Sequence, residues 1–254
     1  MVQGTHKDQA VPVDFHSHIL PSMDDGSKDA EQSLAMLAEA ARQGTSVMVA
    51  TPHFYPENED PSSFLRRRAA SIAQLLDGGY DPETYPRVCV GAEVAYFRGI
   101  GRCDDLKKLC VVGTSVILIE MPFCRWTDTI LEDVSLIRTR LGLTPILAHI
   151  ERYPDMNKAA MRHEMLRRGF VLQINASMMD GLLTRRRAMH MLQRGEVQLL
   201  GSDCHNMTTR SPGMQNMLQY MMNHTGQDIL PQMVRLNRHL LRGAIPLENI
   251  SSDS

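Results

Sequence analysis

Short runs of apolar and β-branched residues alternate with longer stretches in which apolar residues recur every three or four positions, almost from end to end. Runs of the first kind are typical of buried strands in a parallel sheet, whereas the second pattern is typical of amphipathic helices. The pattern predicts strands at residues 13–16, 46–50, 88–94, 115–121, 145–149, 170–175 and 196–202.

Helices are predicted in the intervals between these strands. After the first strand, Leu34, Leu37 and Ala41 share one helical face, and Gly44 marks the end of the helix. The same reasoning predicts helices at residues 29–42, 61–76, 130–141, 155–168, 184–194, 212–223 and 229–242.

Strands that alternate with helices form right-handed βαβ units and a parallel sheet. Seven such units without a low-complexity linker predict an α/β fold in the form of a closed or nearly closed barrel. The alternative is an open, doubly wound sheet. Nucleotide binding is disfavoured, because no strand is followed by a glycine-rich phosphate loop of the GxGxxG or GxxxxGKS/T type.

Length and composition narrow the class of protein further. The 254 residues fit one large α/β domain better than two small ones, so we expect a single domain at residues 12–254, preceded by a flexible extension at residues 1–11. This extension lacks the apolar stretch of a secretory signal, and no apolar run approaches the roughly 20 residues of a membrane span. A formal net charge of -2 gives no electrostatic basis for binding nucleic acid or an anionic membrane. We therefore expect a cytoplasmic protein, whose five cysteines are reduced thiols.

Histidine and acidic residues fall at or just after the ends of the predicted strands. His16 and His18, for example, lie two apart at the end of the first strand, so their side chains share a face. In a parallel barrel the carboxyl ends of the strands meet at one rim, where active sites are built. Nine candidate metal ligands are expected at this rim: His16, His18, Asp25, His53, Glu93, Glu120, His149, Asp203 and His205.

Imidazoles and carboxylates without thiolates favour a catalytic site for Mn, Fe or Zn over a closed structural zinc site. A single His-x-His pair is weak support for metal binding, and a single buried Glu is normally hydrogen-bonded instead. Six of the seven predicted strands end in a potential ligand, and this joint pattern predicts a multinuclear metal centre.

Two arginines are predicted on loops of the same rim. Arg152 lies three residues after His149, and Arg210 lies five residues after His205. A guanidinium group can bind phosphate oxygens bidentately and offset the charge that develops in phosphoryl transfer. The arginine triplets at residues 66–68 and 185–187 are instead expected on solvated helix faces.

Seven segments of the chain, in order, resemble the polymerase and histidinol phosphatase (PHP) superfamily, and more narrowly its bacterial protein-tyrosine phosphatase branch. They are DFHSHILP at residues 14–21, DDG at 24–26, ATPH at 50–53, GAE at 91–93, IEMP at 119–122, HIERY at 149–153 and GSDCHN at 201–206. The resemblance spans about residues 13–245, and the extension at residues 1–11 departs from it.

The resemblance implies a distorted (β/α)7 TIM-like barrel of the PHP type with a trinuclear, usually manganese-dependent site. His16, His18 and Asp203 would hold one ion, Glu120 and His149 a second with Glu93 bridging the two, and Asp25, His53 and His205 a third. Because Asp24 and Asp25 are adjacent, the choice between them stays open. Arg152 and Arg210 would bind the phosphate. The implied substrate is phosphotyrosine in the tail of a bacterial tyrosine autokinase that regulates capsule or exopolysaccharide synthesis.

The expected reaction is direct hydrolysis by water whose pKa is lowered by the cations. A rival is a cysteine-dependent phosphatase, because Cys204 and Arg210 are separated by five residues. Those five residues contain no glycine, which argues against the tight phosphate loop of that class. Two further hypotheses are a small-molecule phosphatase of the histidinol-phosphate type and a non-catalytic metal-binding regulator of a kinase.

Overall fold

The computed structural model describes residues 13–224 and 228–250. The extension expected at residues 1–11 lies outside the described residues. Nine strands are present among these described residues, and every pair of neighbouring strands is parallel. They are β1 (Val13–Ser17), β2 (Val47–Ala50), β3 (His53–Phe54), β4 (Arg87–Val90), β5 (Glu93–Ala95), β6 (Val116–Glu120), β7 (Thr144–Leu147), β8 (Val171–Asn175) and β9 (Leu199–Gly201).

The nine strands occupy seven positions around the sheet, because two positions are interrupted. The first sheet has the order β1-β2-β4 and the second the order β3-β5-β6-β7-β8-β9. Pro52 separates β2 from β3, and Gly91 lies between β4 and β5. Backbone hydrogen bonds run across both interruptions, from Gly91 N to Ala50 O at 2.8 Å and from Glu93 N to Pro52 O at 3.0 Å. The single strand predicted at residues 88–94 is therefore wrong in this detail.

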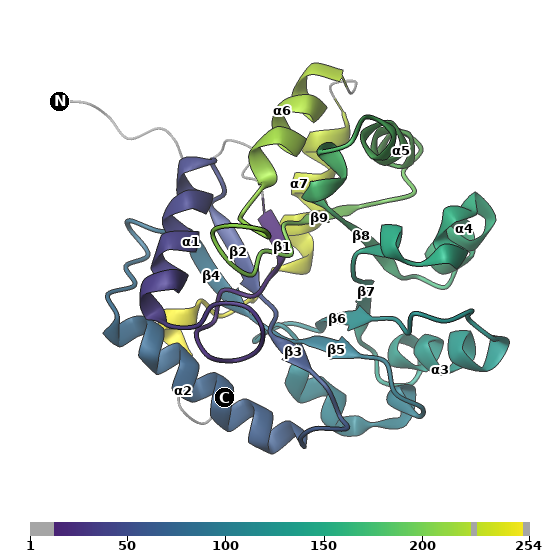
Figure 1. Cartoon of the computed structure of the whole chain (residues 1–254). Coiled ribbons are helices and arrows are strands. Elements are labelled where there is room, and N and C mark those ends of the chain that lie inside the picture. The colour runs from purple at the N-terminus through teal and green to yellow at the C-terminus, as the bar shows by residue number, and fades with distance from the viewer. Residues whose placement is uncertain (1–12, 225–227, 251–254) are drawn as a thin grey trace.

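The last strand position returns to the first and closes the barrel. Asp203 N donates to His16 O at 2.8 Å, His18 N donates to Cys204 O at 2.9 Å, and Ser17 and Cys204 form a parallel bridge. The chains come close here because Gly201 has no side chain, and a Cβ at this residue would lie 2.5 Å from the Cβ of His16. The predicted barrel is confirmed, and the open doubly wound sheet is excluded. Figure 1 shows the strands at the centre of the molecule and the helices around them.

Seven α-helices cover the outside of the described barrel. They are α1 (Ala30–Arg42), α2 (Pro61–Asp77), α3 (Asp128–Thr139), α4 (Ala159–Arg167), α5 (Leu182–Gln193), α6 (Met214–His224) and α7 (Ile229–Leu240). Asp29 and Asp60 cap α1 and α2, since their carboxylates accept hydrogen bonds from free backbone N–H groups of the first turn. None of the described helices is long and apolar enough to cross a membrane.

One predicted helix begins late. The helix expected at residues 155–168 starts only at Ala159, and two 3-10 helices precede it, Ile150–Arg152 and Pro154–Asn157. The chain leaves β7 through His149, whose φ of 31° lies in the left-handed region, so it cannot pass directly into an α-helix. Arg152 is consequently held on a short, tight turn at the rim.

In several strands, alternate residues face two different apolar clusters. In β6, Ile117 and Ile119 pack in the larger cluster with side chains of the outer helices, whereas Val116 and Leu118 belong to a smaller cluster formed mainly by strand residues. The smaller cluster fills the barrel interior. Glu120 continues the inward-facing series of β6, so its carboxylate lies above this apolar layer at the rim.

Arg68 corrects the expectation that the first arginine triplet is solvated. Its side chain is buried on α2, and Nη1 donates to Gly91 O at 3.2 Å. Burial lowers the pKa of Arg68 to about 10. Since Gly91 lies where β4 and β5 are separated, Arg68 supplies a donor at the interrupted strand position.

Candidate metal centre

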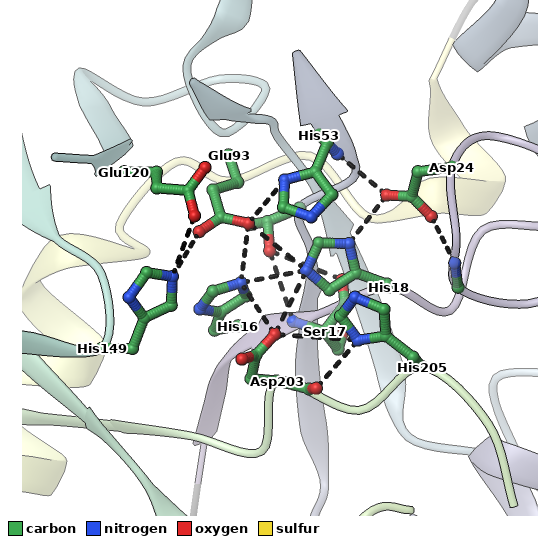
Figure 2. A network of polar contacts seen from close by, with 12 residues as sticks. His16, Ser17, His18, Asp24, His53, Glu93, Glu120, His149, Asp203 and His205 are labelled. Atoms are coloured by element: carbon green, nitrogen blue, oxygen red, sulfur yellow. Dashed lines mark hydrogen bonds and ion pairs between the residues drawn. The ribbon is translucent and has the colours of Figure 1, made fainter. Parts of the chain in front are cut away.

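All nine predicted ligands come together at the carboxyl ends of the strands. They reach this place from every part of the barrel: His16 on β1, His18 and Asp25 in the loop after it, His53 on β3, Glu93 on β5, Glu120 on β6, His149 after β7, and Asp203 and His205 after β9. Eight of them are labelled in Figure 2, where their side chains point toward one another. Their nitrogen and oxygen atoms form four overlapping groups, each compact enough to hold a cation.

The most compact contacts join His16, His18, Glu93 and Asp203. His16 Nε2 lies 3.0 Å from His18 Nε2, 3.1 Å from Glu93 Oε2 and 3.4 Å from Asp203 Oδ1. His18 Nε2 lies 3.4 Å from each of the same two oxygens. Ligand atoms that share one cation at about 2.1 Å are separated by roughly 3.0–3.4 Å in octahedral or tetrahedral geometry. These distances therefore fit a single bound ion.

Glu93 connects this group to its neighbours. Oε2 of Glu93 lies 3.0 Å from His53 Nδ1, while Oε1 lies 2.9 Å from His149 Nε2. His149 Nε2 is in turn 3.7 Å from Glu120 Oε1. A carboxylate whose two oxygens face different ligand groups can bridge two cations. His53 belongs to two possible ion sites. One contains Glu93 and Glu120, and the other contains His18, Asp25 and His205.

A further group lies on the solvent side of His18. His205 Nε2 is 3.3 Å and His53 Nε2 is 3.7 Å from Oδ1 of Asp25. Asp25 is the most exposed residue of the cluster, whereas His205 is buried. The arrangement can accept an ion that is open to substrate on one side.

The unsatisfied polar atoms of the site also fit cations. Glu93 Oε2, His53 Nδ1 and His205 Nε2 are buried and make no hydrogen bond of regular geometry, although the first two atoms lie 3.0 Å apart. Polar atoms in this condition are costly unless a positive charge or a donor satisfies them. Neutral imidazole nitrogens and carboxylate oxygens are the atoms that Mn, Fe and Zn bind, so the residues present fit these ions.

Two arginines stand at the open side of the cluster. Arg210 Nη2 is 2.6 Å from Asp203 Oδ1, and Arg152 Nη1 is 3.8 Å from Asp203 Oδ2. Both side chains are partly exposed, so N–H donors remain available toward solvent. A cavity of about 370 Å³ adjoins Asp203 and Arg210 and is lined mainly by polar side chains, including Asn175.

Comparison with known proteins decides the family. A family model described as "Capsular polysaccharide synthesis, CpsB/CapC" matches residues 12–241. The chain belongs to the CpsB/CapC family.

Named CpsB/CapC relatives are similar over most of their length. The chain is 32% identical to the tyrosine-protein phosphatase CpsB of Streptococcus pneumoniae, covering 80% of this chain and 86% of that protein. It is 28% identical to the tyrosine-protein phosphatase YwqE of Bacillus subtilis, covering 90% and 91%. A crystal structure from the work on YwqE and CpsB, described as unique metal-dependent tyrosine phosphatases, superposes with a TM-score of 0.78 at 24% identity, covering 92% of this chain and 95% of that one.

Asp24 and Asp25 have different environments in this CpsB/CapC chain. Oδ2 of Asp24 accepts hydrogen bonds from His18 Nδ1 at 2.7 Å and His53 N at 2.9 Å, and Oδ1 accepts from Gly26 N at 2.9 Å. Burial by itself raises the pKa of Asp24, but the hydrogen bonds, above all that from His18, hold it well below its usual range. Asp24 thus fixes the tautomer and orientation of His18, as an outer partner of a metal-ligating histidine does. The geometry favours Asp25 as the ligand.

A second set of outer partners, Gln173 and Asn175, was not predicted from the sequence. Gln173 Oε1 accepts from His149 N at 2.8 Å and lies 3.3 Å from His16 Nδ1. Gln173 Nε2 donates to Asn175 Oδ1 at 2.9 Å, and Asn175 Nδ2 donates to Asp203 Oδ2 at 2.8 Å. The sequence contained one indication of this role: Gln173 and Asn175 are two polar residues on one face of the otherwise apolar strand β8. The chain of hydrogen bonds holds three of the nine candidate ligands in position.

His149 and Asp203 are held in an unusual backbone conformation. Their φ angles are 31° and 54°, in the left-handed region that residues with a side chain rarely adopt. Such strain persists only where the surroundings enforce it, and it is commonest at functional sites. At Asp203, the hydrogen bond from its backbone N to His16 O provides that constraint.

Protonation states differ among the residues of the cluster. Burial, together with the charges of His18 and Arg210, lowers the pKa of His205 to about 4, so its imidazole is neutral near pH 7. Burial opposes ionisation of Glu93 and Asp203, but the neighbouring His16 and other cluster histidines hold the pKa of each carboxyl below its usual value. Burial opposes protonation of His16 and His18, but nearby carboxylates, Glu93 and Asp203 among them, hold the pKa of each imidazole above its usual value. Cation binding therefore requires these two histidines to lose a proton, because neutral imidazoles and ionised carboxylates are the forms that bind cations.

Cys204 is unsuited to the rival role of nucleophile. Its side chain is fully buried in the apolar cluster between the barrel and the helices. Burial raises the pKa of the Cys204 thiol well above its ordinary value, so the thiolate is not formed near neutral pH. The Cys-x5-Arg pattern therefore does not form a cysteine-dependent phosphatase site.

Proposed function

We propose that this CpsB/CapC protein is a metal-dependent phosphatase that hydrolyses phosphotyrosine on proteins. The observation that carries the proposal is the convergence of nine histidine and acidic side chains at one barrel rim, with two guanidinium groups at the open side. The names of the relatives, tyrosine-protein phosphatases YwqE and CpsB, support the choice of phosphotyrosine.

We propose the following ligand sets. His16, His18 and Asp203 hold one ion; Glu120 and His149 hold a second, with Glu93 bridging; Asp25, His53 and His205 hold a third. The mixed nitrogen and oxygen donors suit Mn, Fe or Zn. We propose Mn²⁺ among these because the chain resembles the PHP tyrosine phosphatase branch, whose sites are usually manganese-dependent.

The roles of the protein side chains follow from their positions. Bound divalent cations would supply a nucleophile by lowering the pKa of water. Arg210 is anchored by its ion pair with Asp203 and keeps further N–H groups free to bind phosphate oxygens. Arg152 approaches the same carboxylate from the side of His149, so the two guanidinium groups can offset charge on the phosphoryl oxygens as it develops. No covalent phosphoenzyme is required.

The proposed physiological substrate is the tyrosine-rich tail of a bacterial tyrosine autokinase that regulates capsule or exopolysaccharide synthesis. The family description, capsular polysaccharide synthesis, supports this partner. We also propose a cytoplasmic site of action, because all five cysteines are free thiols, as expected in a reducing compartment.

The test is turnover of a phosphotyrosyl peptide by protein of measured metal content, before and after chelation. Chelation is expected to abolish turnover, and added Mn²⁺ to restore it. His149→Ala should lose part of the bound metal, whereas Arg210→Ala should keep the metal and lose roughly 10- to 100-fold in kcat/KM, the value of a hydrogen bond to a charged group.

Three outcomes would contradict parts of the proposal. Normal kcat/KM in Arg210→Ala would remove Arg210 from phosphate binding. Faster turnover of histidinol phosphate than of the peptide would indicate a small-molecule phosphatase. Absence of hydrolysis by fully metal-loaded protein would favour a non-catalytic regulator.

A further inference from the structure

Two aromatic side chains stand exposed beside the candidate metal centre. In the described part of the chain, Phe123 and Tyr55 are the most exposed of the Phe, Tyr and Trp residues, at 57% and 38%. Neither belongs to the proposed ligand set or to the phosphate-binding arginines. An exposed aromatic ring gives up part of the free energy of burial, and two such rings beside one site offer a surface that an apolar group of a ligand can cover.

Both rings lie against proposed metal ligands. Tyr55 directly follows β3, and its ring stacks on His53 with the ring centres 5.0 Å apart. Phe123 follows β6, and its ring centre is 6.3 Å from that of His149 in a stacked orientation. The guanidinium carbon of Arg152 lies 5.2 Å from the centre of the Phe123 ring.

The two histidines flank one carboxylate. His53 contacts Oε2 of Glu93 and His149 contacts Oε1, so the Glu93 side chain lies between them (Figure 2). The aromatic rings stacked on these histidines therefore border the ion cluster from two directions. Each ring keeps part of its surface exposed, although Phe123 also packs against the buried ring of Tyr153, with the ring centres 5.2 Å apart.

We infer that Tyr55 and Phe123 form a subsite that receives the phenyl ring of phosphotyrosine while the arginines bind its phosphate. The inference rests on the proposed phosphotyrosine phosphatase function. In phosphotyrosine the ring is bonded directly to the ester oxygen, so a ring whose phosphate is bound at the cations must lie at the border of the cluster. Aromatic rings attract one another in offset or edge-to-face arrangements at 4.5–7 Å between centres. The aliphatic side chain of phosphoserine offers no such contact.

The test compares two non-hydrolysable ligands that differ only by the ring. Phenylphosphonate and methylphosphonate are titrated calorimetrically into the Mn²⁺-loaded protein, whose metal content is measured first. The wild-type protein should bind phenylphosphonate more tightly. Tyr55→Leu and Phe123→Leu should each weaken phenylphosphonate by roughly three- to tenfold and leave methylphosphonate within about twofold. Tyr55→Phe keeps the ring and should bind both ligands normally.

Tyr220→Leu is a matched control away from the site. The ring of Tyr220 stacks on His224 with centres 3.9 Å apart, and the Arg185 guanidinium carbon lies 5.3 Å from it. The substitution thus removes an aromatic ring from a similar cluster of aromatic, histidine and arginine side chains, formed by α5 and α6. Affinity for both phosphonates should be unchanged.

The results distinguish failure of the proposed aromatic subsite from failure of the proposed phosphatase function. Equal affinity of the wild-type protein for the two phosphonates would overturn the subsite, whatever the variants do. Equal weakening of both ligands in Tyr55→Leu or Phe123→Leu would also overturn it, since the rings would then act by positioning His53 or Arg152. Failure of the proposed function would appear separately, as no hydrolysis of a phosphotyrosyl peptide by the metal-loaded wild-type protein.

Discussion

Asp24→Asn is predicted to weaken metal binding although Asp24 is not a proposed ligand. The side chain is buried and accepts three hydrogen bonds, two at Oδ2 from His18 Nδ1 and His53 N and one at Oδ1 from Gly26 N. An amide has one oxygen and one NH₂ group. Whichever way the Asn side chain turns, its NH₂ group faces at least one N–H donor, and the charge that holds His18 is lost.

The expected loss of metal affinity follows from the hydrogen bond between Asp24 and His18, the shortest of these contacts. A hydrogen bond to a charged group contributes roughly 1.5–3 kcal/mol, and an outer partner of a metal-ligating histidine is typically worth about 10- to 100-fold in metal affinity. These two figures agree, because about 1.4 kcal/mol corresponds to a factor of ten. We therefore expect the tightest Mn²⁺ affinity to fall by roughly 10- to 100-fold.

The assay is a titration of metal-free protein with Mn²⁺ in competition with a chelator of known affinity. Asp29→Asn is the matched control: it removes the same charge nearby, but Asp29 only caps α1 by accepting from Gln32 N at 2.8 Å, and Asn caps helices equally well. Asp29→Asn should bind metal normally. Wild-type affinity in Asp24→Asn would refute the reasoning, and loss of one whole ion per chain would show that Asp24 is itself a ligand.

Three further predictions concern buried positions. Cys204→Ser should keep most phosphatase activity because the thiol is buried and un-ionised, and a loss beyond about tenfold in kcat would contradict this. Gly201→Ala should lower both Tm and metal content, because the new Cβ would lie 2.5 Å from the Cβ of His16; unchanged metal content would show that the barrel seam can widen. Glu196→Gln should destabilise the protein at pH 7 by about 3 kcal/mol, because it breaks a buried ion pair with Arg162. Burial raises the pKa of Glu196, but the hydrogen bonds from Arg162 outweigh this effect and hold the pKa below its usual 4.5. The stability that the ionised Glu196 contributes is therefore present above pH 4.5 and is lost in acid. The difference in Tm between the two proteins should therefore shrink as the pH falls below 4.5, and a constant difference would contradict the assignment.

The sequence predicted the barrel and the position of the site because both depend on a regular pattern. Strands that alternate with helices form a parallel sheet, and the ends of such strands share a rim. Candidate ligands 187 residues apart, such as His16 and Asp203, could therefore be assigned to one place. The split of the third predicted strand was missed, since Gly91 shows only that a break is tolerated there. The burial of Arg68 depends on that break and could not be foreseen either.

What the chain alone determined, then, is which side chains are available at the rim and what ions and charges they suit. Tertiary structure decided which of several nearby polar residues contacts which partner. Asp24 faces His18, while Asp25 faces His205. Within β8, Gln173 and Asn175 form hydrogen bonds that hold three candidate ligands in position. The physical reason is that local periodicity sets the face on which a residue lies, whereas hydrogen-bond partners depend on the packing of segments distant in the chain. The exposed rings of Tyr55 and Phe123 belong to the same class, because only the folded barrel places them against His53 and His149.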